Sequence, residues 1–133
     1  MRQGLTIGRL AQAVGVNVET IRYYQRRGLI AEPHKPPGGH RRYSERVVEQ
    51  IRLIRRAQQL GFSLDDAKQL LAISDGTQCR EARLMAEKKH ELIEVQIARL
   101  EKMRSELEAL IAACRGNRSR TSCPLITALK EGA

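Results

Sequence analysis

Apolar residues recur at helical spacing along most of the chain, and capping residues separate the helical stretches. The first stretch begins after Thr6 and ends at Gly15, and the second, VETIRYYQRR, begins after Asn17 and ends at Gly28. Thr and Asn accept hydrogen bonds from the free N–H groups of a first helical turn, whereas glycine readily adopts the left-handed conformation that ends a helix. Two short helices joined by a tight turn predict a helix-turn-helix motif.

The next segment, residues 29–43, cannot continue as a helix. Its sequence, LIAEPHKPPGGHRRY, holds three of the four prolines and two adjacent glycines. Proline removes a backbone donor, and adjacent glycines favour a turn. We expect a short hairpin with Gly38 and Gly39 at its tip and basic residues on its outgoing side.

Two further helices are expected after this hairpin. Ser44 begins a helix that runs to about Leu60, where Gly61 stops it. Its apolar stripe consists of Val47, Val48, Ile51, Ile54 and Leu60. Ser63 begins the next helix with the capping-box-like sequence SLDD, and Asp75-Gly76 ends it. The inward-facing residues of that helix are Ala67, Leu70 and Leu71.

A last, long helix is expected from about residue 78 to residue 113, where the sequence has neither proline nor glycine. Such a helix is too long for the interior of a small domain and indicates a coiled coil. Cys79 and Cys114 lie 35 residues apart, which is five heptads, so they occupy one stripe of the helix. At about 1.5 Å per residue they are roughly 50 Å apart. One chain cannot join them, whereas two antiparallel chains can.

An antiparallel register supports this dimer. If Cys79 faces Cys114 of a second chain, paired residue numbers sum to 193. The apolar pairs are then Ile93 with Leu100, Ala86 with Leu107, and Ala82 with Ile111. One pair is unfavourable, because Lys89 faces Arg104, although long basic side chains can turn away from each other.

Charge is distributed unevenly along this pattern. Of the net charge of +9, residues 1–61 supply +8 (12 Lys/Arg against 4 Asp/Glu) and residues 62–133 supply +1 (12 against 11). A basic first half followed by a nearly neutral second half is typical of a nucleic-acid-binding module joined to a second module. Aromatic residues make up only 3% of the chain, which favours small lobes over one thick globule.

We expect the chain to act in the cytoplasm, without a membrane partner. No apolar run approaches the roughly 20 residues of a membrane span. The first residues, MRQGLTIGRL, lack the apolar core of a signal peptide. The three cysteines are an odd number, which does not suit a disulfide framework.

The DNA-contacting surface is expected on the second short helix and on the hairpin. The candidate side chains are Thr20, Arg22, Tyr23 and Arg26 on the helix, and His40, Arg41, Arg42 and Tyr43 on the hairpin. Arg and Tyr can reach phosphates and base edges, and a helix of this size fits the major groove. Turn-linked helices with a solvated face are common, so the basic hairpin and the charge asymmetry decide in favour of DNA.

The three cysteines are the candidate metal ligands. Cys79 falls in the first turn of the long helix, and Cys123 lies near a short terminal helix that Pro124 begins. Helix starts stabilise a thiolate, whereas Cys114 at a helix end would need a bound cation. Three thiolates without an evident fourth ligand suit a soft ion, because zinc prefers four ligands. Taken singly, each cysteine is more often a small buried hydrophobic residue.

Three stretches carry a family resemblance: LTIGRLAQAVGVNVETIRYYQRRGLI, HRRYSE and IRRAQQLGFSLDDAKQLL. They resemble the MerR family of bacterial transcription regulators over nearly the whole chain. This resemblance implies a mainly α fold with a winged helix-turn-helix DNA-binding domain (1–76), a long antiparallel dimerisation helix or coiled coil (77–113), and a metal-binding loop with a terminal helix (114–133). It also implies a homodimer that represses its promoter without inducer. With inducer, the dimer distorts promoter DNA so that RNA polymerase can engage it.

The sequences DGTQC and SCPLI, together with Cys114, are similar to the mercury-responsive members of this family. This narrower resemblance implies a mercury(II) site made by Cys79 of one subunit and by Cys114 and Cys123 of the other. Members that sense divalent ions carry cysteine at the position of Cys79. Lead-responsive members have a similar arrangement, so lead(II) or cadmium(II) is the alternative inducer.

Three other classes of function compete with a metal-responsive regulator. A redox sensor usually needs closely spaced thiols, and the chain has no CxxC sequence. An enzyme is disfavoured, because there is no Gly-rich nucleotide loop and no histidine beside a cysteine. A metal-sequestering or structural dimer differs from a regulator in one measurable property, the salt-dependent binding of promoter DNA.

Overall fold

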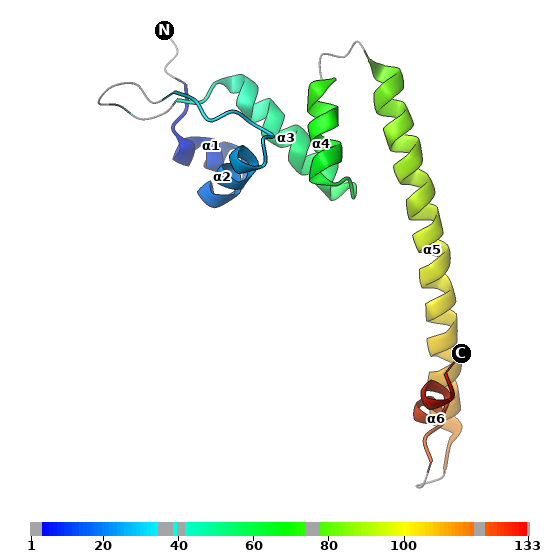
Figure 1. The fold of residues 1–133 in the computed structure, drawn as a ribbon. Helices are drawn as coiled ribbons and strands as arrows, with labels where there is room; N and C mark the ends of the chain where they lie inside the picture. Colours follow the sequence, from blue (N-terminus) through cyan, green and yellow to red (C-terminus); the bar gives the residue numbers. More distant parts are fainter. Residues whose placement is uncertain (1–3, 35–38, 40–41, 74–77, 119–121, 133) are drawn as a thin grey trace. The chain divides into compact units, whose positions relative to one another are not determined.

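The computed structural model describes residues 4–34, 39, 42–73, 78–118 and 122–132. In these residues the backbone forms six α-helices (Figure 1): α1 (Ile7–Val14), α2 (Val18–Arg26), α3 (Glu45–Gln59), α4 (Leu64–Ala72), α5 (Cys79–Gly116) and α6 (Pro124–Glu131). The expected mainly α fold is confirmed. The chain divides into two compact units, Met1–Lys89 and His90–Ala133, so that α5 contributes to both. No described helix is both long enough and apolar enough to span a membrane.

The capping residues define the first two helices as expected. The Thr6 side chain accepts a hydrogen bond from the backbone N–H of Arg9 at 3.3 Å, and the Asn17 side chain accepts one from Thr20 N–H at 2.8 Å. Gly15 ends α1 with φ at +72°, a left-handed conformation that glycine adopts without strain. The two predicted helices, with the tight turn between them, are therefore confirmed.

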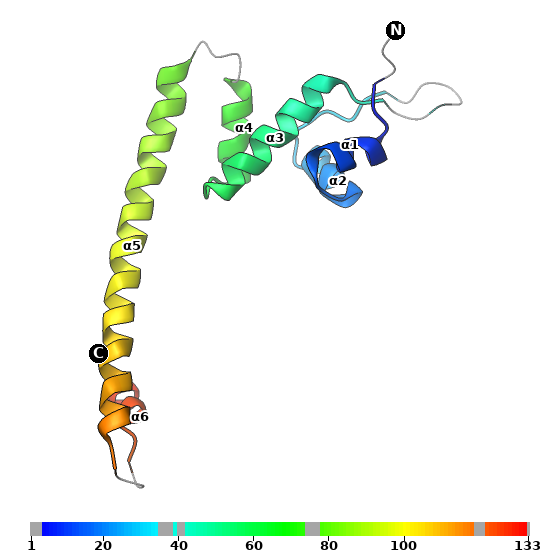
Figure 2. The same ribbon diagram turned by 180° about the vertical axis from the view of Figure 1, so that it is seen from behind.

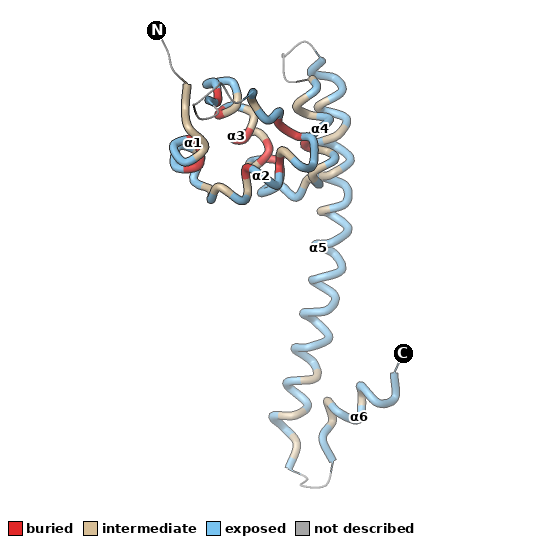
Figure 3. The backbone as a smooth tube through the Cα atoms, turned by 60° about the vertical axis from the view of Figure 1, so that its left-hand side comes forward, coloured by how far each residue is buried: buried red, intermediate tan, exposed pale blue. Residues whose placement is uncertain are grey.

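The core of the first unit lies between α1, α2, α3 and α4. Its fully buried large side chains are Leu10, Ile21, Ile51 and Ile54. Among the described residues, every buried one precedes α5, and Figure 3 shows them in red within the first unit. One member of the predicted α3 stripe is wrong: Leu60 is 50% exposed, and Ala57 is buried in that stripe. Leu60 follows the last residue of α3 as its C-cap, so it leaves the helical periodicity.

The start of the chain pairs with the segment that precedes α3. Leu5 and Tyr43 exchange two backbone hydrogen bonds, at 2.8 and 2.7 Å, in an isolated antiparallel bridge. Gly4 permits this approach, since a Cβ atom there would lie 2.9 Å from the carbonyl oxygen of Tyr43. The predicted hairpin tip at Gly38 lies outside the described residues. Tyr43, the last residue of the predicted hairpin segment, therefore pairs with the start of the chain.

The fourth helix begins with a complete capping box. The Ser63 side chain accepts from Asp66 N–H at 3.0 Å, and the Asp66 carboxylate accepts from Ser63 N–H at 3.3 Å. The inward-facing residues are those predicted, with Ala67 buried and Leu70 and Leu71 packed against the core. Helix α4 ends at Ala72 with Ile73 as its C-cap, before the predicted stop at Asp75-Gly76, which lies outside the described residues.

Helix α5 is continuous from Cys79 to Gly116 and none of its 38 residues is buried. It extends three residues beyond the predicted end, so Cys114 lies in its last turn. Figures 1 and 2 show α6 beside the C-terminal end of α5. Pro124 is the first residue of α6 and Cys123 its N-cap, as the sequence indicated. Large hydrophobic side chains remain exposed along α5: Leu84, Leu92, Val95, Ile97, Leu100, Met103, Leu107 and Ile111.

Candidate functional site

Helix α2 presents an exposed tyrosine flanked by two arginines. The Tyr23 side chain is 38% exposed. The guanidinium carbons of Arg26 and Arg27 lie 5.8 and 5.6 Å from the centre of its ring, within cation–π range. Arg27 Nη1 also donates a hydrogen bond to the Tyr23 hydroxyl at 2.7 Å. These contacts hold two positive charges and a hydroxyl together on one exposed face, which suits binding to phosphate oxygens.

The N-terminal half of α2 holds two more predicted contact residues. Arg22 is exposed and pairs with Glu19 at 3.0 Å. Exposed ion pairs of this kind stabilise proteins little, so Arg22 can exchange the carboxylate for a phosphate. Thr20 is only partly exposed, and its hydroxyl donates to Asn17 Oδ1 at 3.0 Å. Its hydroxyl oxygen can still accept a hydrogen bond.

The predicted contact residues of the hairpin differ from one another in exposure. Arg42 is exposed, whereas the side chain of Tyr43 is only 2% exposed and its hydroxyl accepts from Gln25 Nε2 at 2.6 Å. The prediction of a DNA contact for Tyr43 is therefore wrong, because burial beneath α2 leaves its ring no free surface. His40 and Arg41 lie outside the described residues.

Tyr24 has a structural role that the sequence reasoning missed. It is 3% exposed, and its hydroxyl donates to Gln58 Oε1 at 3.0 Å, which joins α2 to α3. Burial raises the pKa of Tyr24, and the nearby Arg55 opposes this shift. The helical period of α2 could have predicted this burial. Successive residues of a helix point about 100° apart, so Tyr24 lies on the same face as the apolar Ile21, whereas Tyr23 faces outward.

The second unit brings two of the three cysteines together. The sulfur atoms of Cys114 and Cys123 lie 3.8 Å apart, although the two residues are nine positions apart in the chain. Cys114 lies in the last turn of α5 and Cys123 directly before α6, so the two helix ends position both thiols. Cys123 is exposed and Cys114 partly exposed, which leaves the pair open to a ligand.

The surroundings of Cys123 favour its thiolate. The backbone N–H of Ile126 in the first turn of α6 lowers the pKa of Cys123 below the usual 9.0, and the Cys114 thiol lowers it further. Cys123 is the N-cap of α6, so its sulfur lies near the positive end of the helix dipole. The lowered pKa agrees in direction with the prediction that the start of this helix stabilises the Cys123 thiolate.

A side chain that the sequence reasoning missed links the two arms of this loop. Asn117 Nδ2 donates to the carbonyl oxygen of Ser122 at 2.8 Å, and Asn117 N–H donates to the Cys114 carbonyl at 3.1 Å. The Thr127 N–H donates to the Cys123 carbonyl at 2.9 Å. Each cysteine is thus anchored through its own backbone. An asparagine just after a helix end was the available signal, because Asn readily hydrogen-bonds nearby backbone groups.

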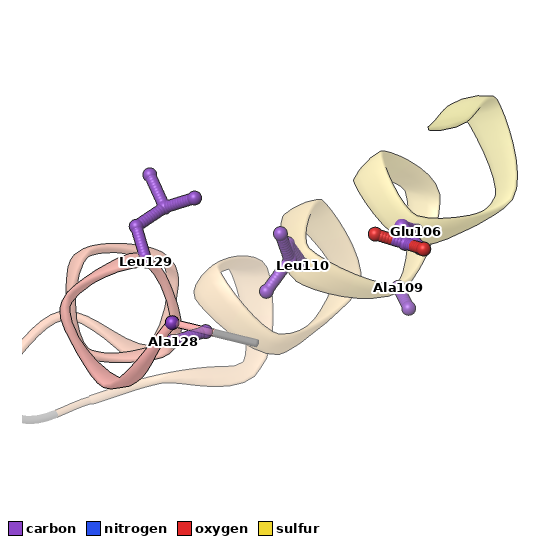
Figure 4. A pocket seen from close by; sticks show the side chains of 6 residues that line it. Glu106, Ala109, Leu110, Ala128 and Leu129 are labelled. Atoms are coloured by element: carbon purple, nitrogen blue, oxygen red, sulfur yellow. The ribbon is translucent and has the colours of Figure 1, made fainter. Parts of the chain in front are cut away.

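An apolar cleft of about 500 Å³ lies between α5 and α6. Its lining residues are Glu106, Ala109, Leu110, Ala128, Leu129 and Gly132 (Figure 4). Leu110 precedes Cys114 by one helical turn, so the cleft continues the surface on which the thiols lie.

The third cysteine, Cys79, is the exposed first residue of α5. In the described part of a single chain, no cluster of three or more His, Cys, Asp or Glu side chains is placed to hold a metal ion. One chain therefore presents a pair of thiols and, at the other end of α5, a single thiol. The predicted joining of Cys79 to the pair of a second chain stays a prediction.

Family models and relatives agree on the class of protein. Residues 5–73 match the model described as "MerR HTH family regulatory protein", and residues 48–110 match the one described as "MerR, DNA binding". A "Mercuric resistance operon regulatory protein" from Pseudomonas fluorescens is 50% identical over 131 residues, covering 98% of this chain and 91% of the relative.

Solved structures show the same likeness. A regulator from Ralstonia metallidurans CH34, PbrR691 in complex with lead(II), is 27% identical with a TM-score of 0.79, over 93% of this chain and 98% of the other. The dual-function regulator MerR from Bacillus megaterium MB1, in complex with mercury(II), is 34% identical with a TM-score of 0.72, over 95% and 99%. The helix-turn-helix, the long helix and the full-length likeness together show that the chain belongs to the MerR family of transcription regulators.

Proposed function

We propose that the chain is a mercury(II)-responsive transcription regulator of a mercury-resistance operon. The observation that carries this proposal is the pair of thiols 3.8 Å apart, in a chain that is 50% identical to a mercuric resistance regulator over 98% of its length. Soft thiolates select soft metal ions. Because two helix ends already hold Cys114 and Cys123 together, two of the three proposed ligands are in place before the metal binds. The proposal assigns no catalytic residue.

The metal site would be completed across a dimer. Cys114 and Cys123 of one chain would supply two sulfurs, and Cys79 of the other chain the third. The positions of the cysteines support this division, because the pair lies at one end of α5 and Cys79 at its other end. Two antiparallel copies of α5 would place each single thiol beside a pair, which makes two equivalent sites.

The exposed apolar side chains of α5 support the same dimer. A helix with no buried residue and eight large exposed hydrophobic side chains needs a partner to cover them. The antiparallel register that sets Cys79 against Cys114 also sets Ile93 against Leu100, where Leu100 is 60% exposed in the single chain. Burial of these residues would supply the free energy of association.

The first unit would bind promoter DNA through α2. Its contact residues would be Thr20, Arg22, Tyr23 and Arg26 on α2, Arg27 at the C-cap of α2, and Arg42 before α3. Tyr24 and Tyr43 are buried and hold α2 on the core through their side-chain hydrogen bonds. Without metal the dimer would repress; with mercury(II) it would distort the promoter so that RNA polymerase can use it. Such a protein works where promoter DNA and polymerase are, in the bacterial cytoplasm.

A metal titration of the reduced, metal-free protein tests this proposal. Mercury(II), lead(II), cadmium(II) and zinc(II) are added in parallel, and thiolate-to-metal charge-transfer absorption is followed. We expect mercury(II) to saturate first and to outcompete the other three ions. Tighter binding of lead(II) or cadmium(II) would favour the alternative, a lead- or cadmium-responsive regulator, for which the likeness to a lead-bound regulator is the supporting observation.

Three matched variants connect this binding to transcription. Cys79→Ser, Cys114→Ser and Cys123→Ser should each abolish induction by mercury(II) and leave binding to the promoter unchanged, because all three thiols lie outside the contact surface on α2. Wild-type induction in the Cys79→Ser strain would refute the shared site. Arg26→Ala is the opposite control, since it should weaken DNA binding and leave metal absorption intact.

A further inference from the structure

We propose that Cys114 and Cys123 also form a reversible disulfide within one chain, by exchange with a small-molecule disulfide such as oxidised glutathione. The disulfide and metal binding would exclude one another. The disulfide is inferred from the geometry of the two thiols, and only the mutual exclusion with metal rests on the proposed function. The redox chemistry would thus use the same two sulfurs that receive the metal.

The distance between the sulfur atoms supports this bond. At 3.8 Å they are in contact, and a disulfide requires about 2.05 Å, so the two sulfurs must approach by about 1.8 Å. Cys123 is the exposed N-cap of α6, so rotation about its Cα–Cβ bond can carry its sulfur toward Cys114. The approach therefore needs rotation of side chains and a small adjustment at one helix end.

The contact is built into the fold. The hydrogen bond from Asn117 to the Ser122 carbonyl closes the loop between the cysteines, and each cysteine carbonyl accepts a further backbone hydrogen bond. The thiols therefore meet because two helix ends are tied together. Closing a ring between residues only nine positions apart adds little entropic cost, because the two thiols are already in contact.

The exchange balances in two steps. The sulfur of the exposed Cys123, as thiolate, attacks one sulfur of oxidised glutathione, and one glutathione thiolate leaves. Cys114 then attacks Cys123 in this mixed disulfide and expels the second glutathione thiolate. Two protein thiols are oxidised, one glutathione disulfide is reduced to two glutathiones, and the two protons pass from protein to glutathione. Excess reduced glutathione reverses both steps, as expected for an exposed disulfide.

Metal binding requires thiolates, so the disulfide removes two of the three proposed ligands. In the reverse direction, a metal ion held by both sulfurs leaves neither free to attack glutathione. The oxidised regulator would then fail to respond to mercury(II) until it is reduced. The regulator would therefore bind and respond to mercury(II) only in a cell that keeps Cys114 and Cys123 reduced.

The full-length reduced protein is incubated with oxidised glutathione, and thiols and masses are measured after alkylation. We expect three free thiols to fall to one, with a mass lower by two hydrogen atoms and the mobility of a single chain on a non-reducing gel. Cys79→Ser should fall from two thiols to none. Cys114→Ser is the matched control and should stop at the mixed disulfide on Cys123. A chain-to-chain disulfide, or a stable mixed disulfide on Cys114 or Cys123 in the Cys79→Ser protein, would overturn the proposal.

A second arm separates this inference from the proposed function. Protein loaded with mercury(II) should keep its thiols through the same oxidation, and oxidised protein should lose its charge-transfer absorption. If the protein binds no mercury(II) but the disulfide still forms, the proposed function fails and the disulfide stands. If metal-loaded protein oxidises as fast as metal-free protein, mutual exclusion is refuted.

Discussion

The adjacent tyrosines of α2 offer a sharp test of the division between core and DNA surface. Tyr24 is buried and donates to Gln58 at 3.0 Å, whereas Tyr23 is exposed and accepts from Arg27. Tyr24→Phe keeps the buried ring and removes one hydrogen bond. The released acceptor on Gln58 is exposed and can bind water, so no buried polar group is left unpaired. The expected loss is about 1 kcal/mol in the free energy of unfolding.

Urea unfolding at one fixed protein concentration measures this loss. With a slope of about 1–3 kcal/mol per molar urea, a loss of about 1 kcal/mol lowers the midpoint by about 0.3–1 M. The slope itself should not change, because the folded core stays the same. Binding of promoter DNA by the folded Tyr24→Phe protein should equal that of the wild type.

Tyr23→Phe is the matched control, because it removes the same hydroxyl group from the neighbouring residue. Its hydroxyl is on the surface, so the free energy of unfolding should change by less than about 0.5 kcal/mol. Loss of one hydrogen bond to DNA should weaken promoter binding about 2- to 10-fold. Equal destabilisation by both substitutions would refute the reasoning, as would an unchanged urea midpoint for Tyr24→Phe.

Three further predictions concern caps and titrating groups. Ser63→Ala removes the capping-box acceptor of α4 and should cost about 1 kcal/mol in urea unfolding. Burial raises the pKa of Tyr24 in the folded state, so its contribution to stability is complete below pH of about 10 and is lost as pH rises through the folded pKa. The urea midpoint of the wild type should fall more steeply there than that of Tyr24→Phe; parallel curves would contradict this. In a Cys79→Ser/Cys114→Ser protein, alkylation of Cys123 should show a lower pH midpoint in the folded state than after unfolding in urea, because the start of α6 stabilises the thiolate; equal midpoints would contradict this.

Local signals predicted the helical skeleton well, because each depends on a few neighbouring residues. Thr6, Asn17 and Ser63 cap their helices through side-chain hydrogen bonds, and Gly15 adopts the left-handed conformation expected of a helix end. These choices are made by unpaired N–H groups and by backbone sterics, which sequence shows directly. The predicted burial of Leu60 was wrong because the apolar periodicity of the sequence continues past Gln59, where the helix ends.

Non-local contacts were harder to predict. The burial of Tyr43 depends on its pairing with Leu5 and on Gln25, residues far from it in the chain. Charge and aromatic character alone had placed it on the DNA surface. The proximity of Cys114 and Cys123 came from the family resemblance, since no periodicity carries through the loop between them. The Asn117 side chain that closes this loop was missed for the same reason.

Complementation between mutant chains tests the shared metal site most directly. One chain carries Cys79→Ser and keeps the thiol pair; the other carries Cys114→Ser and Cys123→Ser and keeps Cys79. Each alone should lack the three-thiolate absorption with mercury(II). After unfolding and refolding together, random pairing makes half of the dimers mixed, each with one intact site. The account predicts recovery of about one quarter of the wild-type absorption per chain. No recovery on mixing, or full three-thiolate absorption from either mutant alone, would contradict it.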